Sequence, residues 1–342
     1  MTDFQALVNR INKDMKDNVL FIGDQWQQPE ITRISTGSLY LDWATNGGIP
    51  MARLTEIFGN ESVGKSALAA KIISEAQRKK MTCVWIDAEN SYDPKWMEKL
   101  GIDVSQLIVS QLGESESGFD LLFKLVSLGS PRSPEYKGIE PIDLIVADSL
   151  AAFAPMAVTD HDMQSHMAVD ARVNNLGFKR INARNRHAAV VIINQNRSSI
   201  GGPRPTDFQP GGRGLKYYAS MRLEVRGGEW IKPVDVPDYM NIETNPRAKD
   251  DPVGHNIRFR VRKCKVGGPH GKEANFDFYY NGRVDKIKDI ITAGKITGVI
   301  DQGGAYFKYG EQSFHGAKAF ADFLKSDKVA LREIRKQVLE AL

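Results

Sequence analysis

The sequence predicts an α/β fold in which helices cover both faces of a doubly wound, mostly parallel sheet. Two observations predict it. Three short, mostly apolar segments at 81–87, 142–148 and 188–194 have the length of buried strands and alternate with helical stretches. Upstream, residues 59–66 fit the pattern G-x-x-x-x-G-K-[ST] between a strand and a helix. Ligands of such sheets bind beyond the carboxyl ends of the strands.

The composition is that of an ordinary globular protein. The 342 residues suffice for a large core with one or two small appended domains, and 42% hydrophobic content argues against disorder. The net charge of +4 is too small to identify a partner. Cys83 and Cys264 lack metal-ligand spacing and fit a reducing compartment. The sequence shows neither a leader peptide nor a run of about 18 apolar residues, so we expect a cytoplasmic protein without a membrane partner.

The N-terminal region predicts an amphipathic helix over about residues 3–17. Phe4, Leu7, Val8, Ile11 and Met15 recur at helical spacing and form one apolar stripe. A polar linker follows and ends near residue 30. Residues 1–30 therefore form a separate segment, which either folds back on its own domain or docks on a neighbouring subunit.

The glycine-rich motif predicts a nucleoside triphosphate site. Residues 54–58 form the strand before it and residues 67–78 the helix after it, whose N-terminus favours anions. We expect the Lys65 ammonium to reach the β- and γ-phosphates and the Ser66 hydroxyl to bind Mg²⁺. The residues that enclose the phosphates are Gly59, Asn60, Glu61, Ser62, Val63, Gly64, Lys65 and Ser66.

Polar side chains end the three apolar segments, where the chemistry of a parallel sheet is located. Asp148 ends one strand and is placed to hold Mg²⁺ through water. Glu89 follows another strand and could polarise an attacking water as a general base, or be a helix-capping or surface acid. Gln195 ends the third and can bind a γ-phosphate or a water without changing the charge of the site.

Two stretches after these strands are candidate nucleic-acid loops. Residues 196–213 hold four glycines, three prolines and three arginines, which suits contact with phosphates and bases but also fits a floppy loop. Residues 155–167 offer Met156, Met163, His166 and Met167 to bases, although the methionines could be core residues. The stretch 253–272 carries arginines and lysines without an acid, which is either a solvated face or a source of cations for phosphates.

The remaining elements are predicted from capping and periodicity. Asp93-Pro94 begins a helix that Gly101 ends, and residues 165–186 form a long helix with one apolar side. Residues 233–252, with four prolines, are expected to form an irregular segment on the surface. Apolar residues then alternate with arginines over 257–262, which predicts a strand. Residues from about 285 to 342 form a small lobe with helical periodicity around a turn at Gly303-Gly304.

Together these motifs resemble those of RecA-type homologous recombinases, and the resemblance covers nearly the whole chain. The residues that carry it are Ile34-Ser35-Thr36-Gly37-Ser38, the glycine-rich motif, Ile86-Asp87-Ala88-Glu89, Asp93-Pro94, Asp148-Ser149, Ser165-His166-Met167, Ile193-Asn194-Gln195, Gly211-Gly212 and Lys216-Tyr217-Tyr218-Ala219-Ser220. The resemblance implies a DNA-dependent ATPase that forms helical filaments on single-stranded DNA and exchanges strands with homologous duplex DNA. It also implies a RecA-like ATPase core over 31–282 and a C-terminal lobe over 283–342.

The resemblance assigns a role to each site residue. Glu89 becomes the catalytic base, Asp148 the Mg²⁺-associated acid and Gln195 the sensor of the γ-phosphate of ATP. Lys263 and Lys265 match lysines that reach the ATP of the adjacent protomer, while Asp93 and Trp96, where the family has a tyrosine, match the adenine contacts. The DNA contacts that it implies are Met167, Arg172, Arg197, Ile200, Gly211, Gly212 and Arg213. The N-terminal helix would pack on a neighbour, and mediator or single-strand-binding proteins are expected partners.

Some features depart from the family pattern. Pro203, Pro205 and Phe208 give the second loop an unusual composition, Tyr217 replaces a phenylalanine, and 227–252 is longer than expected. The sequence also shows no long acidic tail. This divergence is compatible with a bacteriophage-encoded relative, so we expect the cytoplasm of a bacterial or phage-infected host cell. Three other functions stay open on the residues alone: a ring-forming helicase, a nucleotide-gated DNA-coating or mediator protein, and a small-molecule kinase. The preference for ATP over GTP also stays open.

Overall fold

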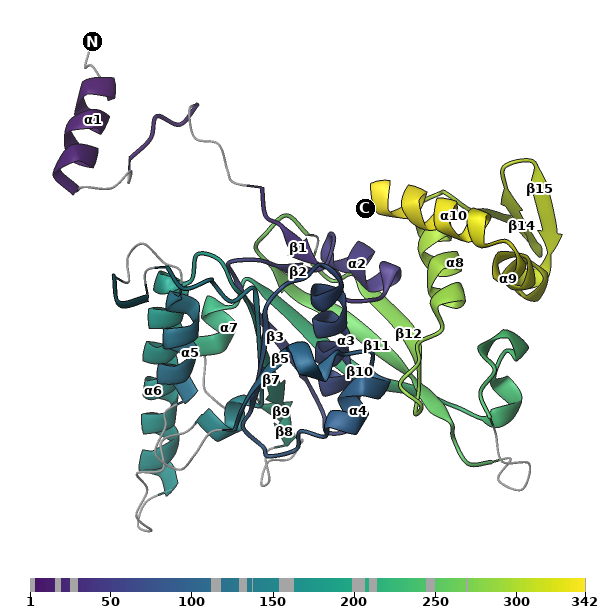
Figure 1. Cartoon of the computed structure of the whole chain (residues 1–342), viewed down its shortest axis with the longest axis horizontal. Helices are drawn as coiled ribbons and strands as arrows, with labels where there is room; N and C mark the ends of the chain where they lie inside the picture. The colour runs from purple at the N-terminus through teal and green to yellow at the C-terminus, as the bar shows by residue number, and fades with distance from the viewer. Residues whose placement is uncertain are drawn as a thin grey trace. The chain divides into compact units, whose positions relative to one another are not determined.

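The computed structural model describes residues 4–15, 20–24, 30–111, 118–128, 134–136, 138–153, 163–198, 207–208, 214–243, 250–268 and 270–341. The chain divides into two compact units, residues 1–32 and 33–342 (Figure 1). Within the described residues, no helix combines the length and the hydrophobicity that a membrane-spanning segment needs.

The first unit contains helix α1, Phe4–Met15, which lies inside the predicted range of 3–17. None of its residues is buried, and Phe4, Leu7 and Met15 of the apolar stripe are exposed. Asn12 fixes the chain that follows: its side-chain oxygen accepts from the Leu20 amide at 2.8 Å and its nitrogen donates to the Leu20 carbonyl at 2.9 Å. The described residues of this unit therefore do not bury the apolar stripe of α1.

An eight-stranded sheet forms the centre of the second unit, in the order β12-β11-β10-β3-β7-β6-β4-β5. The six strands from β10 to β5 are parallel, and β11 and β12 extend the sheet in antiparallel fashion. This confirms the predicted mostly parallel α/β fold. The strands are β3 Leu54–Gly59, β4 Cys83–Asp87, β5 Leu107–Gln111, β6 Leu144–Asp148, β7 Ala189–Gln195, β10 Met221–Ile231, β11 Gly254–Cys264 and β12 Glu273–Tyr279.

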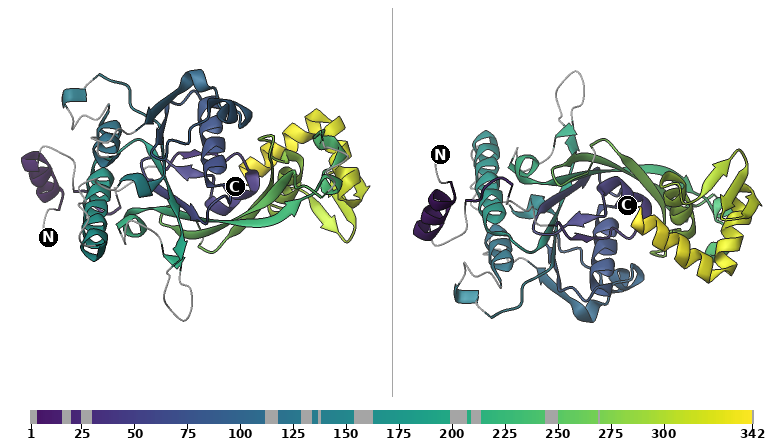
Figure 2. Two further views of the ribbon diagram at one scale, coloured as in Figure 1. Left: turned by 90° about the horizontal axis from the view of Figure 1, so that it is seen from below. Right: turned by 90° about the horizontal axis from the view of Figure 1, so that it is seen from above.

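Helices cover both faces of this sheet (Figure 2). On one face, α5 (Gly118–Ser127), α6 (Met163–Arg184) and α7 (Gly214–Tyr218) bury a core with alternate strand residues such as Val84 and Ile192. Helix α3, Lys65–Arg78, covers the opposite face. The core is tight where α5 meets α6, because a β-carbon on Gly177 would lie 2.3 Å from the Phe119 ring. The two-sided burial explains why the parallel strands read as continuous apolar runs.

The last part of the chain contains its own small sheet. The helices α8 (Lys286–Ile296), α9 (Gly316–Ser326) and α10 (Lys328–Glu340) pack with the antiparallel strands β13 (Asp301–Gly303), β14 (Tyr306–Tyr309) and β15 (Gln312–His315). Phe307, Phe320 and Leu324 are buried in this core. The sequence predicted the helices and the glycine turn, but strands of three or four residues are too short to show an alternation. The turn at Gly303-Gly304 joins β13 to β14.

The remaining elements are short. They are α2 (Leu39–Thr45), α4 (Pro94–Lys99), β1 (Arg33–Ile34), β2 (Ile49–Pro50), β8 (Arg197–Ser198), β9 (Asp207–Phe208) and the 3₁₀ turns η1 (Val104–Gln106), η2 (Pro134–Tyr136), η3 (Leu150–Phe153), η4 (Pro233–Asp235) and η5 (Asp238–Met240). As predicted, Asp93 caps α4, with Pro94 at its first position.

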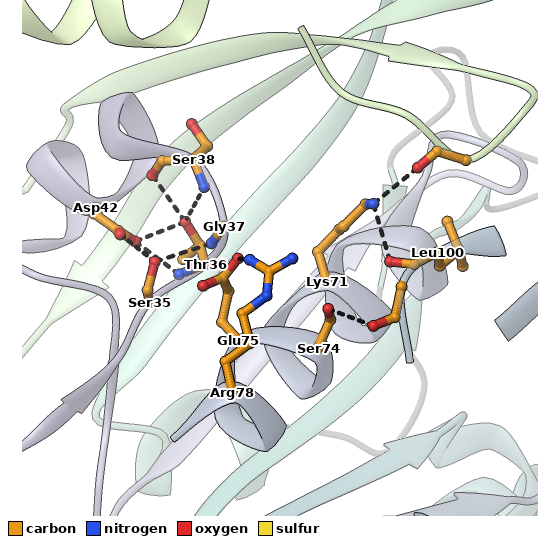
Figure 3. A network of polar contacts seen from close by, with 12 residues as sticks. Ser35, Thr36, Gly37, Ser38, Asp42, Lys71, Ser74, Glu75, Arg78 and Leu100 are labelled. Atoms are coloured by element: carbon orange, nitrogen blue, oxygen red, sulfur yellow. Dashed lines mark hydrogen bonds and ion pairs between the residues drawn. The ribbon is translucent and has the colours of Figure 1, made fainter. Parts of the chain in front are cut away.

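Polar contacts around α3 fix the helix that follows the glycine-rich motif (Figure 3). Lys71 donates to the Leu100 carbonyl at 3.0 Å and to the Gly282 carbonyl at 2.8 Å, and Ser74 donates to the Gly101 carbonyl at 2.7 Å. Beside α3, the buried Asp42 carboxylate accepts from the Thr36 amide and hydroxyl, both at 2.7 Å. The bonds of Lys71 and Ser74 join α3 to the end of α4 and to the chain that leads into α8.

Replacing Asp289 with alanine is expected to lower the free energy of unfolding by about 1–3 kcal/mol. Asp289 lies on α8 and is buried, and its carboxylate accepts from the Ser38 hydroxyl at 2.6 Å and the Leu39 amide at 2.7 Å at the start of α2. The alanine leaves these donors unpaired in a buried site. Urea unfolding followed by circular dichroism measures the loss. Asp301→Ala, at an exposed position of the same lobe, should change stability by less than about 0.5 kcal/mol.

Candidate active site

The glycine-rich motif adopts a backbone conformation that only glycine can accommodate at two of its positions. A β-carbon on Gly59 would lie 2.1 Å from the Val225 carbonyl oxygen, and one on Gly64 would lie 2.4 Å from Ile257. Gly64 also has a φ of +96°, in the left-handed region that favours glycine. The backbone therefore turns tightly between β3 and the N-terminus of α3, an end of a helix that favours anions.

Lys65 lies inside this turn. Helix α3 begins at Lys65, whose ammonium donates to the Asn60 carbonyl at 2.5 Å. Burial lowers the pKa of Lys65, while the nearby Asp148, Glu89 and Glu61 carboxylates oppose this shift. The ammonium is thus held at the strand ends among carboxylates, where it can bind a phosphate group as a point charge.

Ser66 and Asp148 meet at the end of β6. The Ser66 hydroxyl donates to the Asp148 carboxylate at 2.6 Å, which brings together residues from the glycine-rich turn and from the predicted Mg²⁺ position. Burial raises the pKa of Asp148 to about 6, a shift that Ser66 opposes and Glu89 increases. Within the described residues, no cluster of three or more His, Cys, Asp or Glu forms a metal cage. One hydroxyl and one carboxylate fit Mg²⁺, which usually keeps waters and phosphate oxygens as its other ligands.

Glu89 and Gln195 are in direct contact. The Gln195 side-chain nitrogen donates to the Glu89 Oε1 atom at 2.9 Å, and the Ser149 hydroxyl donates to the same oxygen. Asp87, by contrast, is buried and accepts from the Ser91 and Tyr92 amides, both at 3.0 Å. Asp87 thus shapes the turn after β4, while the exposed Glu89 carboxylate can accept a proton from a water.

Asp93 and Trp96 lie at the start of α4. Asp93 accepts from the Lys95 amide at 2.9 Å, and the Trp96 ring packs edge-to-face on Phe278, with centroids 6.3 Å apart. The sequence reasoning missed the aromatic wall to which Phe278 belongs. Its members, from β10 to the residue after β12, are Trp230, His255, Phe278 and Tyr280. Only the antiparallel pairing of these strands reveals the wall, because its residues are far apart in the sequence.

Lys263 and Lys265 contact α7. The Lys263 ammonium donates to the Lys216 carbonyl at 2.6 Å and to the Tyr217 carbonyl at 2.9 Å, at the C-terminal end of α7. Burial, together with the positive charges of Lys265 and Arg222, lowers the pKa of Lys263 to about 8. Lys265 lies over the Tyr217 ring at 5.5 Å from its centroid.

The predicted arginine face of β11 is paired with acids from its neighbours. Arg262 donates to Glu224 at 2.5 Å, and Arg258 and Arg260 lie 3.5 Å from Glu229 and Glu273. The acids come from β10 and β12, so the local sequence 253–272 could not show them. This partial neutralisation weakens the case for the strand as a phosphate-binding surface.

The predicted DNA contacts are described only in part. Arg172 is exposed on α6, and Met167 lies within the same helix, which begins at Met163 where the sequence predicted a loop to residue 167. Arg197 belongs to β8 and pairs with Phe208 of β9, so the stretch 196–213 contains a strand pair instead of being structureless throughout. Ile200, Gly211, Gly212 and Arg213 lie outside the described residues.

Comparison with known proteins identifies a match over most of the chain. The family model for the RecA N-terminal domain matches residues 3–285. A protein named Protein RecA from Thermus aquaticus is 35% identical over 321 residues, which cover 91% of this chain and 86% of the relative. Protein RecA from a strain of Thermus thermophilus is 34% identical over 335 residues, 95% and 89% of the two chains. Protein RecA from a strain of Caulobacter vibrioides is 33% identical over 332 residues, 94% and 85%.

Proposed function

Because this chain belongs to the RecA family of homologous recombinases, we propose that the strand ends around Lys65, Glu89 and Asp148 form its ATPase centre. The protein is a DNA-dependent ATPase that performs homologous pairing and strand exchange in recombination and repair. It uses ATP, binds DNA and assembles into filaments, as the family does. The assignments that follow concern its own residues.

The glycine-rich turn holds the triphosphate. Backbone amides of residues 59–66 and the Lys65 ammonium bind the phosphates, and Ser66 and Asp148 hold Mg²⁺. When bound, Mg²⁺ neutralises charge on the β- and γ-phosphate oxygens. Glu89 orients the attacking water and accepts its proton, a role that requires the exposed carboxylate that the structure presents. Asp93 and Trp96 contact the adenine, with Trp96 offering a ring face.

The other assignments concern the assembly. Lys263 and Lys265 complete the ATP site of an adjacent protomer, and the N-terminal segment 1–30 docks its apolar stripe on a neighbour. Residues 31–282 act as the ATPase core and 283–342 as the C-terminal lobe. The strand pair β8–β9 and the residues Met167, Arg172, Arg197, Ile200, Gly211, Gly212 and Arg213 contact single-stranded DNA. We place this activity in the cytoplasm of a bacterial or phage-infected cell, with mediator or single-strand-binding proteins as partners.

The contact between Gln195 and Glu89 couples the binding of ATP to the binding of DNA. Gln195 is the last residue of β7, and β8 begins two residues later at Arg197. Its amide reaches the carboxylate that activates water, at 2.9 Å. A γ-phosphate bound at the same strand ends competes for this amide and so repositions the start of the DNA-binding segment.

Replacing Gln195 with alanine is expected to uncouple DNA binding from the nucleotide. With a slowly hydrolysed ATP analogue, the natural protein should bind single-stranded DNA about 10- to 100-fold more tightly than without it, in the range of ordinary allosteric couplings. Gln195→Ala should reduce this ratio to about threefold or less, because the phosphate loses its contact with β7. Fluorescence anisotropy measures both affinities.

Gln111→Ala, which removes an exposed amide at the end of β5 on the same sheet edge, serves as the matched control and should keep the ratio. Negative-stain images of the same samples should show helical filaments for the natural protein. Closed rings would instead indicate a helicase, and a Gln195→Ala protein with an unchanged ratio would contradict the proposed coupling.

A further inference from the structure

A buried ion pair lies within the central sheet, outside the site described above. Glu56 on β3 is fully buried, and the Arg222 guanidinium on β10 donates to its Oε2 atom. The guanidinium also lies 4.5 Å from the centroid of the Phe58 ring. Removing two charges from water is costly, so a buried ion pair adds little net stability over an apolar pair of the same size. Net stabilisation of the fold therefore does not explain why these two charges are buried, and the contacts of the pair indicate another role.

Further polar side chains from the neighbouring strands lie next to this ion pair. Arg222 lies opposite Glu56 on one side and opposite Lys263 of β11 on the other. On β7, the Asn194 amide donates to the Glu56 Oε1 atom at 3.0 Å, and its oxygen accepts from the Gln195 backbone amide at 3.0 Å. Asn194 lies opposite Phe58, two residues beyond Glu56 on β3, and therefore faces the same side of the sheet as Glu56. The polar side chains of Asn194, Glu56, Arg222 and Lys263 thus share one face across four strands.

This row meets both ends of the segment 196–213. At its start, Asn194 and Gln195 immediately precede the segment and bind Glu56 and Glu89, respectively. At its end, α7 immediately follows the segment, and Lys263 holds the last carbonyls of α7 at 2.6 and 2.9 Å. Asn194 and Lys263, which are far apart in the sequence, thus share the Glu56–Arg222 pair as their common neighbour.

We propose that Glu56, paired with Arg222, is a positioning residue that ties both ends of the segment 196–213 together. The inference rests on the proposed function, in which Gln195 responds to ATP of its own protomer and Lys263 to ATP of the adjacent one. With the Glu56–Arg222 pair intact, a shift of β7 is transmitted to α7 and a shift of α7 to β7. The ATP of this protomer and the ATP of the adjacent protomer therefore both act on the segment 196–213. Without it, β7 and α7 respond independently and each nucleotide loses part of its effect on DNA binding.

Glu56→Gln tests the link, because glutamine keeps the shape and one acceptor oxygen but loses the charge that Arg222 requires. The measured quantity is the ratio of single-stranded DNA affinities with and without a slowly hydrolysed ATP analogue. We expect this ratio to fall from about 10- to 100-fold to about threefold or less. The affinity for a fluorescent ATP analogue without DNA should stay within about twofold, since Glu56 contributes no group to the phosphate site.

A matched control separates positioning from a general loss of stability. Asp277→Asn removes the charge of another buried carboxylate of the same sheet, which on β12 accepts from the exposed Lys288 ammonium of α8 at 2.5 Å. It should leave the affinity ratio unchanged, and comparison of the thermal midpoints of the two variants shows whether a loss of stability by itself lowers the ratio. The double variant Glu56→Gln/Arg222→Gln should lose no more of the ratio than either single variant, because both changes remove one link.

The outcomes distinguish this inference from the function on which it rests. If the natural protein itself shows no dependence of DNA affinity on the nucleotide, the proposed function fails. If the natural protein shows the dependence and Glu56→Gln keeps it, or Asp277→Asn loses it equally, the positioning role of Glu56 is wrong.

Discussion

Replacing Glu89 with glutamine is expected to lower kcat for ATP hydrolysis in the presence of single-stranded DNA by about 10²-fold or more. The glutamine oxygen can still accept from Ser149 and Gln195, so the local hydrogen bonds are kept. The amide cannot accept a proton from water at neutral pH, and the lost step is the chemical one. A steady-state phosphate-release assay measures the effect.

The same variant should still bind DNA in response to ATP, because the triphosphate and its contact with Gln195 are unaffected. We expect ATP-dependent DNA affinity within about threefold of the natural protein, and complexes that last longer because hydrolysis no longer ends them. Glu98→Gln, an exposed acid of α4, controls for the loss of one negative charge and should hydrolyse ATP normally. Normal turnover by Glu89→Gln would exclude Glu89 as the base.

Replacing Lys65 with alanine is expected to abolish ATP-dependent strand exchange and to reduce kcat/KM for ATP by about 10²- to 10³-fold, as the loss of a charged group on a transferring phosphoryl does. The ammonium is the cation that the structure places inside the turn, beside Asp148, Glu89 and Glu61. Its removal leaves these three carboxylates to repel the triphosphate. Exchange between a circular single strand and a labelled homologous duplex, with and without ATP, measures the loss.

Two further variants make this test specific. Lys65→Arg keeps the charge but not the compact ammonium that donates to Asn60, and it should remain strongly impaired. Lys79→Ala removes an exposed lysine just after the end of the same helix and should exchange strands normally. The proposed site would be disproved by ATP-dependent exchange with Lys65→Ala at the natural rate.

The features of this protein that could be predicted from sequence are those encoded by neighbouring residues. The turn from β3 to α3 depends on glycines at fixed spacing, and the buried strands β4, β6 and β7 depend on continuous apolar runs. Asp148, Glu89 and Gln195 follow from the rule that parallel strands end at one edge. These local patterns were enough to predict the fold class and to gather the residues of the candidate active site.

The features that could not be predicted depend on strand order. Glu56 and Arg222 are 166 positions apart, and only the pairing of β3 with β10 makes them neighbours. Likewise, the acids that pair with the arginines of β11 come from the strands on either side, and His255 meets Trp230 and Phe278 only across the antiparallel extension. Side-chain alternation gives the face of each residue but does not give its partner in the next strand.

Lys71 has a mechanical consequence within the protomer. One ammonium joins the middle of α3 to the end of α4 at Leu100 and to the lead-in of the C-terminal lobe at Gly282. Because Lys71 donates two hydrogen bonds to backbone carbonyls, it resists separation of α3 from these two segments, which a lysine exposed to solvent would not do. A displacement of the chain at Gly282 is therefore transmitted directly to α3, the helix that begins at Lys65.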